Sequence, residues 1–259
     1  MNGLKQFNWS GWLSFGFLLC FWEIGARAAP KLQLYIPPFS QVLAALGQLA
    51  VSGPMAAHFM ITVGRFLEGY LLSAALGVSL GIVLGYFRSF HSLLAMLIEF
   101  LRPMPSVAII PVAILMLGIG DSMIVAVTVY ATVWPILINC IDGVRHIESI
   151  LIDTGRTFGL KRRQILWQII LPGASPYIVT GLRVGLSIAL ILVTTAEMIA
   201  GSKGLGFFIL DEERSMNSAA MYAGILLVAA LGYLLNRLFL YVEAKTMKWR
   251  HGMMARASA

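Results

Sequence analysis

Charged residues are scarce in this sequence. Asp, Glu, Lys and Arg together make up 12% of the 259 residues, whereas hydrophobic residues make up 59%. In a soluble domain about a quarter of the residues are charged. The shortage of charge argues against a soluble globular domain and predicts an all-α fold, a polytopic membrane helical bundle formed by one domain over residues 1–259.

Cysteine and histidine are also rare. Cys20 and Cys140 lie in apolar stretches, where free thiols behave as small hydrophobic groups, so neither a disulfide framework nor a thiolate metal site is indicated. The four histidines are scattered without the spacing of metal ligands: His58, His91, His146 and His251. We therefore expect no metal site.

Nucleotide-binding and catalytic motifs are missing. The chain has no glycine-rich loop ending in Gly-Lys-Ser or Gly-Lys-Thr, the element that cradles ATP phosphates. No pair of a nucleophile and a base can be assembled from its motifs. We expect a chain that is not an enzyme and that binds no cofactor itself.

Six apolar stretches are each long enough to cross a bilayer, which takes about 20 residues. They cover residues 10–29, 62–87, 92–118, 122–141, 176–200 and 217–241. The first has no convincing cleavage site after it, so we interpret it as a retained span and not a signal peptide. Between the first two stretches, a short interfacial helix is expected after the prolines of segment 30–60.

The basic residues flank the apolar stretches, which explains the net charge of +7 without nucleic acid as a partner. Because each span crosses the membrane once, the segments between spans alternate between its two sides. Most of the basic residues lie in the segments on one side: Lys5, Arg88, Arg145, Arg156, Lys161, Arg162, Arg163, Lys245, Lys248, Arg250 and Arg256. Few lie in the other segments: Arg27, Lys31, Lys203 and Arg214. By the positive-inside rule, both termini and segment 143–175 are expected in the cytoplasm.

Proline and glycine mark two structural expectations. Three prolines in the third stretch, within residues 103–111, should break that span where protein or water satisfies the freed carbonyls. Glycines four residues apart predict close helix contacts in the second and fifth spans: Gly77, Gly81 and Gly85, and Gly181 and Gly185.

The segment 151–172, LIDTGRTFGLKRRQILWQIILP, differs from its surroundings because it is amphipathic and charged. Apolar residues such as Ile150, Leu151 and Phe158 share one helical face. Gly159 allows a turn, and a second apolar run is expected to stop at Pro172. The pattern indicates helix, turn and helix, and physical reasoning leaves open a hairpin that rests on anionic lipid.

This segment resembles the cytoplasmic loop of ABC-transporter permeases, whose pattern is Glu-Ala-Ala, three residues, Gly, about nine residues and Ile-x-Leu-Pro. The matching residues are Asp153, Thr154, Gly155, Gly159, Ile169, Leu171 and Pro172. Asp-Thr-Gly replaces Glu-Ala-Ala, which keeps the acid and the small residues but lowers helix propensity. Residues 101–121 and 181–206 are similar to the nitrate, sulfonate, taurine and bicarbonate branch, so the resemblance covers about residues 10–245.

The resemblance implies a type I ABC importer permease fold in a bacterial cytoplasmic (inner) membrane. Segment 143–175 would be the cytoplasmic coupling loop, with Phe158 among the residues that dock in a separate ATPase subunit. The family assembles two permeases, here expected as a homodimer, with two ATPases that bind ATP and Mg²⁺ and an extracytoplasmic substrate-binding protein. Nitrate, sulfonate, taurine or bicarbonate are the implied substrates, although relatives also carry vitamin precursors and aromatic acids.

Candidate translocation residues are Met104 and Ser106 in the proline-rich stretch, Met116 after it, and Glu197 in the fifth span. Glu197 is equally compatible with a structural pairing to a lysine or arginine. The spacing of Arg65 and Glu68 favours a helical ion pair over a pathway gate. Segment 201–218 is expected to be an outer loop, either simply solvated or docking the binding protein. A self-sufficient secondary transporter or channel is the alternative function, and a membrane enzyme ranks last.

Overall fold

The computed structural model describes residues 9–29, 31, 33–51 and 54–247, and within these ranges the regular structure is helical. The elements are α1 (Trp9–Ala28), α2 (Phe39–Val51), α3 (Pro54–Tyr86), α4 (Arg88–Leu101), η2 (Ser106–Ile109), α5 (Ile110–Leu117), α6 (Asp121–Arg145), α7 (Ser149–Thr157), α8 (Arg162–Ile165), the π-helical turn η3 (Leu166–Ile170), α9 (Leu171–Ala200), α10 (Leu205–Arg214) and α11 (Ser218–Thr246).

The long helices follow the six predicted apolar stretches in order. By length and composition, four described helices could cross a membrane: α3, α6, the continuous α8–η3–α9 helix and α11. The bent pair of α4 with η2 and α5 would make a fifth span, and α1 coincides with the first stretch. The predicted interfacial helix in segment 30–60 is present as α2.

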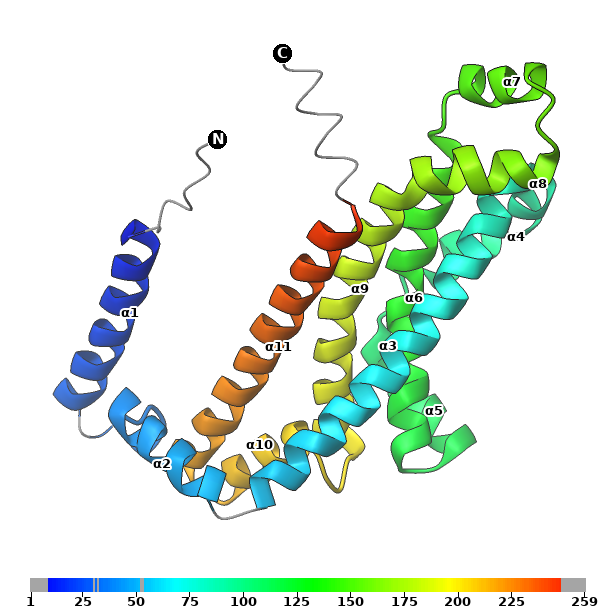
Figure 1. The fold of residues 1–259 in the computed structure, drawn as a ribbon. Coiled ribbons are helices and arrows are strands. Elements are labelled where there is room, and N and C mark those ends of the chain that lie inside the picture. Colours follow the sequence, from blue (N-terminus) through cyan, green and yellow to red (C-terminus); the bar gives the residue numbers. More distant parts are fainter. Residues whose placement is uncertain (1–8, 30, 32, 52–53, 248–259) are drawn as a thin grey trace.

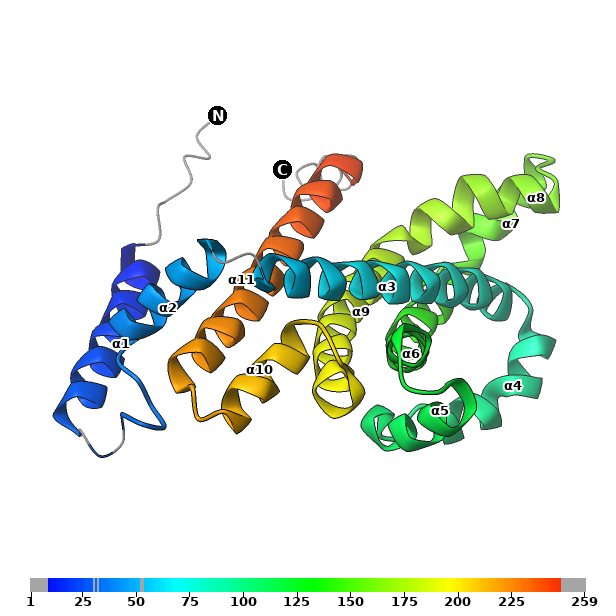
Figure 2. The ribbon, with the colours of Figure 1, turned by 90° about the horizontal axis from the view of Figure 1, so that it is seen from below.

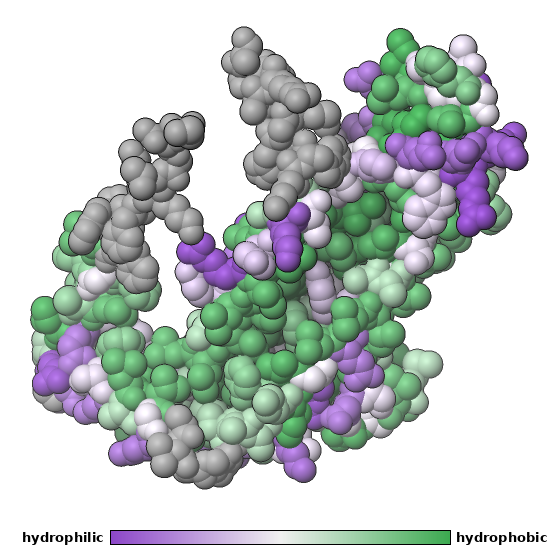
Figure 3. Space-filling model, in the orientation of Figure 1, coloured by the Kyte–Doolittle hydropathy of each residue, from purple (hydrophilic) through white to green (hydrophobic). Residues whose placement is uncertain are grey.

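Two ends of the bundle are distinguishable. The hairpin of α7 and α8 lies at one end, to which the start of α1 and the end of α11 also point, whereas α2, α5 and α10 lie at the other (Figure 1). On the face shown in Figure 3, apolar surface covers the middle of the bundle and hydrophilic side chains gather toward its ends. We call these the α7 end and the α10 end.

The third predicted span is broken, as its prolines indicated. The axes of the two halves differ by 89° across the break at residues 102–105. The carbonyl of Leu101 lacks its usual partner because Pro105 has no N–H, and the Tyr130 hydroxyl donates a hydrogen bond of 2.8 Å to it. Pro111 lies in the first turn of α5, where no backbone donor is required.

The helix at the centre of the bundle is α6, which lies between α3, α9 and α5 when the molecule is viewed from the α10 end (Figure 2). The predicted glycine contacts are confirmed. A Cβ atom added to Gly77 would lie 2.8 Å from Ile136 Cγ2, and one added to Gly181 would lie 2.8 Å from Asn139 Cβ. Glycine on both flanking helices therefore lets their backbones approach α6 closely.

The expected stop at Pro172 is wrong, because the helix runs from Arg162 through Pro172 to Ala200. The Leu171 N–H bonds to the carbonyl of Leu166, five residues back, in the π-helical turn η3. Pro172 follows as the second residue of α9, where a missing N–H is tolerated. The hairpin is thus continuous with the span that carries Glu197.

Candidate functional site

The inward face of α7 is defined by Gly155, which is buried against the second arm of the hairpin. A Cβ atom at this position would lie 2.6 Å from Ile169 Cδ1. Ile169 is half-buried and packs, with Ile152 and Leu160, against a small apolar cluster around Val144. Gly155 and Ile169, two of the motif residues, are therefore in contact and hold the two arms together.

The turn between the arms depends on Gly159, whose φ of +76° is unfavourable for other L residues. Its N–H bonds to the Arg156 carbonyl at 2.9 Å, and the Leu160 N–H bonds to the Gly155 carbonyl at 3.0 Å. This pair of bonds is a Schellman motif, which ends α7 and redirects the chain. The second arm starts at Lys161, whose N–H bonds to Gln164 Oε1 at 2.8 Å.

The outward face of α7 is apolar and unpartnered among the described residues. Phe158 is 81% exposed, and Ile150 and Leu151 are at least half exposed. Asp153 and Thr154 are exposed on the same short helix, and Asp153 pairs with Arg156 at 3.0 Å. Exposed aromatic and aliphatic side chains with charged neighbours are the composition of a protein-docking surface.

Leu171 and Pro172 complete the motif at the point where the hairpin becomes the span. Leu171 is half-buried and Pro172 is exposed. The Pro172 carbonyl accepts a hydrogen bond of 2.7 Å from the Ser175 hydroxyl. Their position at η3 places them where the helix changes its hydrogen-bond register.

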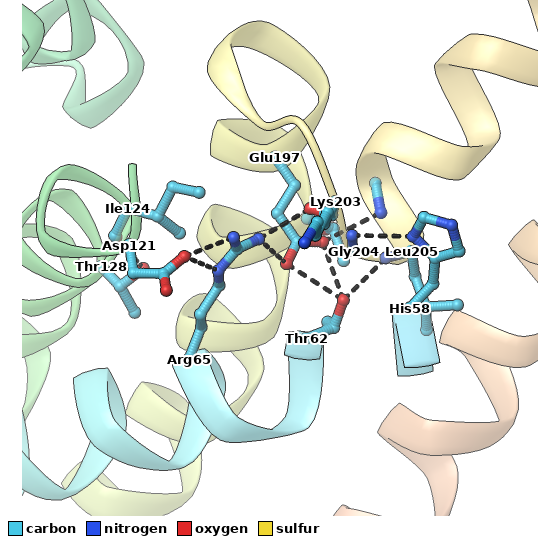
Figure 4. A network of polar contacts seen from close by, with 12 residues as sticks. His58, Thr62, Arg65, Asp121, Ile124, Thr128, Glu197, Lys203, Gly204 and Leu205 are labelled. Atoms are coloured by element: carbon cyan, nitrogen blue, oxygen red, sulfur yellow. Dashed lines mark hydrogen bonds and ion pairs between the residues drawn. The ribbon is translucent and has the colours of Figure 1, made fainter. Parts of the chain in front are cut away.

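A second cluster of polar side chains lies at the α10 end (Figure 4). Glu197 has no exposed surface, and its carboxylate accepts bonds from the Thr62 hydroxyl at 2.8 Å, Arg65 Nη1 at 2.8 Å and the Gly206 N–H at 3.0 Å. A buried charge is tolerated when it is paired and hydrogen-bonded in this way. We call Thr62, Arg65, Asp121, Glu197 and the backbone of residues 203–206 the polar network.

Arg65 connects three helices within the polar network. Its Nε atom donates to Asp121 Oδ1 at 2.8 Å, while Nη1 reaches Glu197 and the Lys203 carbonyl, each at 2.8 Å. The expected pairing with Glu68 is wrong, because Arg65 points into the bundle and Glu68 is exposed. Of the alternatives for Glu197, the structural pairing with an arginine is the arrangement observed.

The polar network also fixes the start of α10. The Thr62 hydroxyl accepts from the Leu205 N–H at 2.7 Å, and His58 Nδ1 accepts from the Gly204 N–H at 3.0 Å. Residues 205–214 form a helix whose Leu205 and Phe208 are buried, so the expectation of a loop is wrong there. Thr62 and His58 gave no signal in the sequence, because their partners lie at least 135 residues away.

The other candidate pathway residues lie on the broken span, apart from Glu197. Met104 and Met116 are exposed, Met116 by 78%, and Ser106 is half-exposed. Met104 lies in the break after α4, Ser106 begins η2, and Met116 lies near the end of α5. A second protein surface is needed to enclose them, so their role stays a prediction.

An all-helical apolar bundle with an exposed, partly apolar helix at one end is typical of a membrane subunit that contacts a partner protein. The comparison with known families identifies which kind. Residues 73–248 match the family described as binding-protein-dependent transport system inner membrane component, and the chain belongs to this family. It is a permease of the ABC importer class, with an ATPase and a binding protein as partners in an inner membrane.

Individual relatives agree with this assignment. A Methanocaldococcus jannaschii protein that is named, by inference, as an ABC transporter permease is 34% identical over 88% of this chain and 83% of the relative. The taurine transport system permease of Escherichia coli is 29% identical over 91% of this chain and 87% of the relative. The bicarbonate transport system permease of Synechococcus elongatus is 31% identical over 69% of this chain and 65% of the relative.

Among solved structures, an inward-facing MetNI methionine ABC transporter shares the fold. The superposition has a TM-score of 0.64 with 18% sequence identity, and it covers 74% of this chain and 96% of the other. The expected type I ABC importer permease fold is thereby confirmed.

Proposed function

We propose that this permease moves a small anion or organic acid, and that α7 docks in a groove of the ATPase subunit to couple ATP hydrolysis to transport. The coupling role is supported by the two different faces of α7, one packed against the hairpin and one exposed. Gly155 is buried against Ile169, whereas Phe158 and Ile150 are exposed with no partner among the described residues. A helix that is fixed on one side and apolar on the other is suited to transmit movement.

The coupling set is Asp153, Thr154, Gly155, Phe158, Gly159, Ile169, Leu171 and Pro172, all within the hairpin or its junction with α9. We assign the outward residues to the ATPase contact and the inward ones to the rigidity of the hairpin. ATP and Mg²⁺ bind the partner, in two copies for a pair of permeases. Because the ATPase is cytoplasmic, the α7 end and both termini are assigned to that side, in agreement with the basic residues there.

The test is co-purification with the ATPase subunit and stimulation of its activity. Replacing Phe158 and Gly159 together with alanine removes the anchor and strains the turn, so association should be lost. Phe17→Ala is the matched control, because Phe17 is equally exposed but lies on α1. Retained association in the Phe158 and Gly159 variant, or transport by this chain alone without ATP, would refute the coupling role.

The substrate class rests on the relatives, whose names include sulfonate, taurine and bicarbonate transport. Because the candidate pathway residues are mostly apolar, we assign selectivity to the binding protein. Affinity of that protein for taurine, alkanesulfonates, nitrate and bicarbonate can be measured by calorimetry. Binding of only solutes that carry no anionic group would contradict the assignment.

The pathway is proposed to lie between two copies of this chain, along Met104, Ser106 and Met116. Glu197, which has no exposed surface, is proposed to support the outer end of the pathway through the polar network and not to line it. Support comes from the exposed, broken helix, which protein must cover in a membrane. A thiol reagent should block transport by a Ser106→Cys variant. The control Met60→Cys is exposed on α3, away from the break, and its labelling should leave transport unchanged.

A further inference from the structure

A basic cleft of about 900 Å³ lies at the α7 end, between the turn from α3 to α4 and the hairpin. Its lining includes four arginines, Arg88, Arg145, Arg156 and Arg162, and no carboxylate. Asp142 and Glu99 act electrostatically on His91, which lines the cleft, but neither is a lining residue. The cleft is therefore a concentration of positive charge.

The arginines are largely without acidic partners. Within the described part of the chain, only Arg156 forms an ion pair, with Asp153. The guanidinium of Arg145 contacts His91 Nε2 at 3.3 Å and the Leu84 carbonyl at 3.4 Å. Uncompensated guanidinium groups converging on one cavity favour an anion with several acceptor oxygens, and phosphate fits their geometry.

The surroundings of the cleft indicate where such a phosphate comes from. Phe87 and Phe90 line the cleft, are about half exposed and contact each other edge to face, which places apolar surface directly beside the arginines. Along α4, apolar side chains continue from the lining residues Ser89 and Ser92 toward the α10 end. This exposed stripe consists of Leu93, Met96, Leu97 and Phe100.

We propose that this cleft binds the headgroup of an anionic phospholipid, with the acyl chains lying along the exposed stripe of α4. The phosphate would be held by Arg88 and Arg145, one from each side of the cleft. Basic pockets between helices on the cytoplasmic side of a membrane are suited to anionic headgroups. The apolar stripe favours a lipid over a free phosphate ion, because acyl chains can pack against it and a free ion cannot.

The test is native mass spectrometry of the purified permease in complex with its ATPase subunit. Dioleoylphosphatidylglycerol or dioleoylphosphatidylcholine is added at equal concentration, and bound lipid is counted. We expect retained phosphatidylglycerol and little phosphatidylcholine. Replacing both Arg88 and Arg145 with glutamine should lower phosphatidylglycerol occupancy at least about tenfold.

Two control variants make the result specific. Arg163→Gln removes one exposed charge next to Arg162 but outside the cleft, and lipid occupancy should stay within about twofold of the parent. The double lysine variant at Arg88 and Arg145 keeps the charge and should retain most of the lipid, which separates loss of charge from a folding defect.

Three outcomes would overturn the proposal. They are equal binding of both lipids, retained phosphatidylglycerol in the double glutamine variant, and arginine-dependent binding of millimolar inorganic phosphate without lipid, which would make the cleft a free-anion site. The measurement reads lipid binding and not transport, so its failure would leave the importer assignment unchanged.

Discussion

At the α7 end, the apolar side chains of Phe158 and Ile150 are exposed, and the hairpin is shaped by two glycines and backbone hydrogen bonds. At the α10 end, Glu197 and Arg65 are withdrawn from solvent and satisfied by partners on α3, α6 and the start of α10. The first end leaves interactions open for another protein, whereas the second completes them within the chain. Substitutions at the two ends should therefore separate docking from stability.

The largest effect is expected from Arg65→Met, which leaves the buried Glu197 carboxylate without its cation. Breaking a buried pair in this way costs roughly 3–5 kcal/mol. The thermal unfolding midpoint of the purified permease in detergent should fall sharply. Glu68→Gln, on the exposed side of the same helix, is the control and should leave the midpoint nearly unchanged. Equal unfolding midpoints for Arg65→Met and Glu68→Gln would mean that the polar network at the α10 end does not stabilise the fold.

A smaller loss of stability is expected from Gly204→Ala. Gly204 has a φ of +111°, and an added Cβ would overlap the Glu197 carboxylate. Such backbone strain costs roughly 1–3 kcal/mol. The control Gly47→Ala lies in α2 with open space around it, and it should stabilise by up to about 1 kcal/mol. Unfolding curves of both variants measure the difference, and an unchanged Gly204→Ala curve would contradict the role of the network in fixing α10.

Gly155→Leu should affect docking more than stability. The larger side chain would push Ile169 away and displace α7, while the helix contacts around α6 remain. We expect loss of ATPase association with a change in unfolding free energy of about 1 kcal/mol, at the low end of the cost of overpacking, because Gly155 is the only buried residue of α7. Gly155→Ala is the control, since only the flexible end of Ile169 must move, and it should keep association. A large drop in the unfolding midpoint for Gly155→Leu would show that the hairpin supports the whole bundle.

The smallest effect is expected from Asp153→Asn. The Asp153–Arg156 pair is exposed on both sides, and exposed pairs contribute about 0.2–1 kcal/mol. Hydrogen exchange of the α7 amides should rise slightly, and less at high salt. If Asp153→Asn lowered the unfolding midpoint as much as Arg65→Met does, the α7 end would be stabilised by charge and not by packing.

The sequence predicted the helices and the hairpin because their signals are local. Apolar runs of sufficient length locate spans, and Gly159 indicates a turn wherever it occurs in a helical pattern. The partners of Arg65 were not predictable in this way. Glu68 is near in sequence, whereas Asp121 and Glu197 are 56 and 132 residues away and become neighbours only when three helices pack.

Two further errors also have physical causes, one local and one long-range. Pro172 suggested a helix end because it lacks an N–H donor. In the π-helical turn before it the hydrogen bonds shift to carbonyls five residues back, and the helix continues through the proline. Segment 201–218 was expected to be a loop because of its glycines and charges. The backbone N–H groups of residues 204–206 are bound by His58, Thr62 and Glu197, which start a helix that composition alone did not indicate.

The uninterrupted helix from Arg162 to Ala200 joins the hairpin's second arm directly to the span behind it. At 1.5 Å per residue, its 39 residues correspond to about 58 Å along the helix. A sideways force applied near Ile165 would act on Glu197 as on the far end of a lever, with η3 and the prolines beside it as the most compliant section. If α7 couples to the ATPase as proposed, the stiffness of that section would decide how much of the movement of α7 reaches the polar network around Glu197.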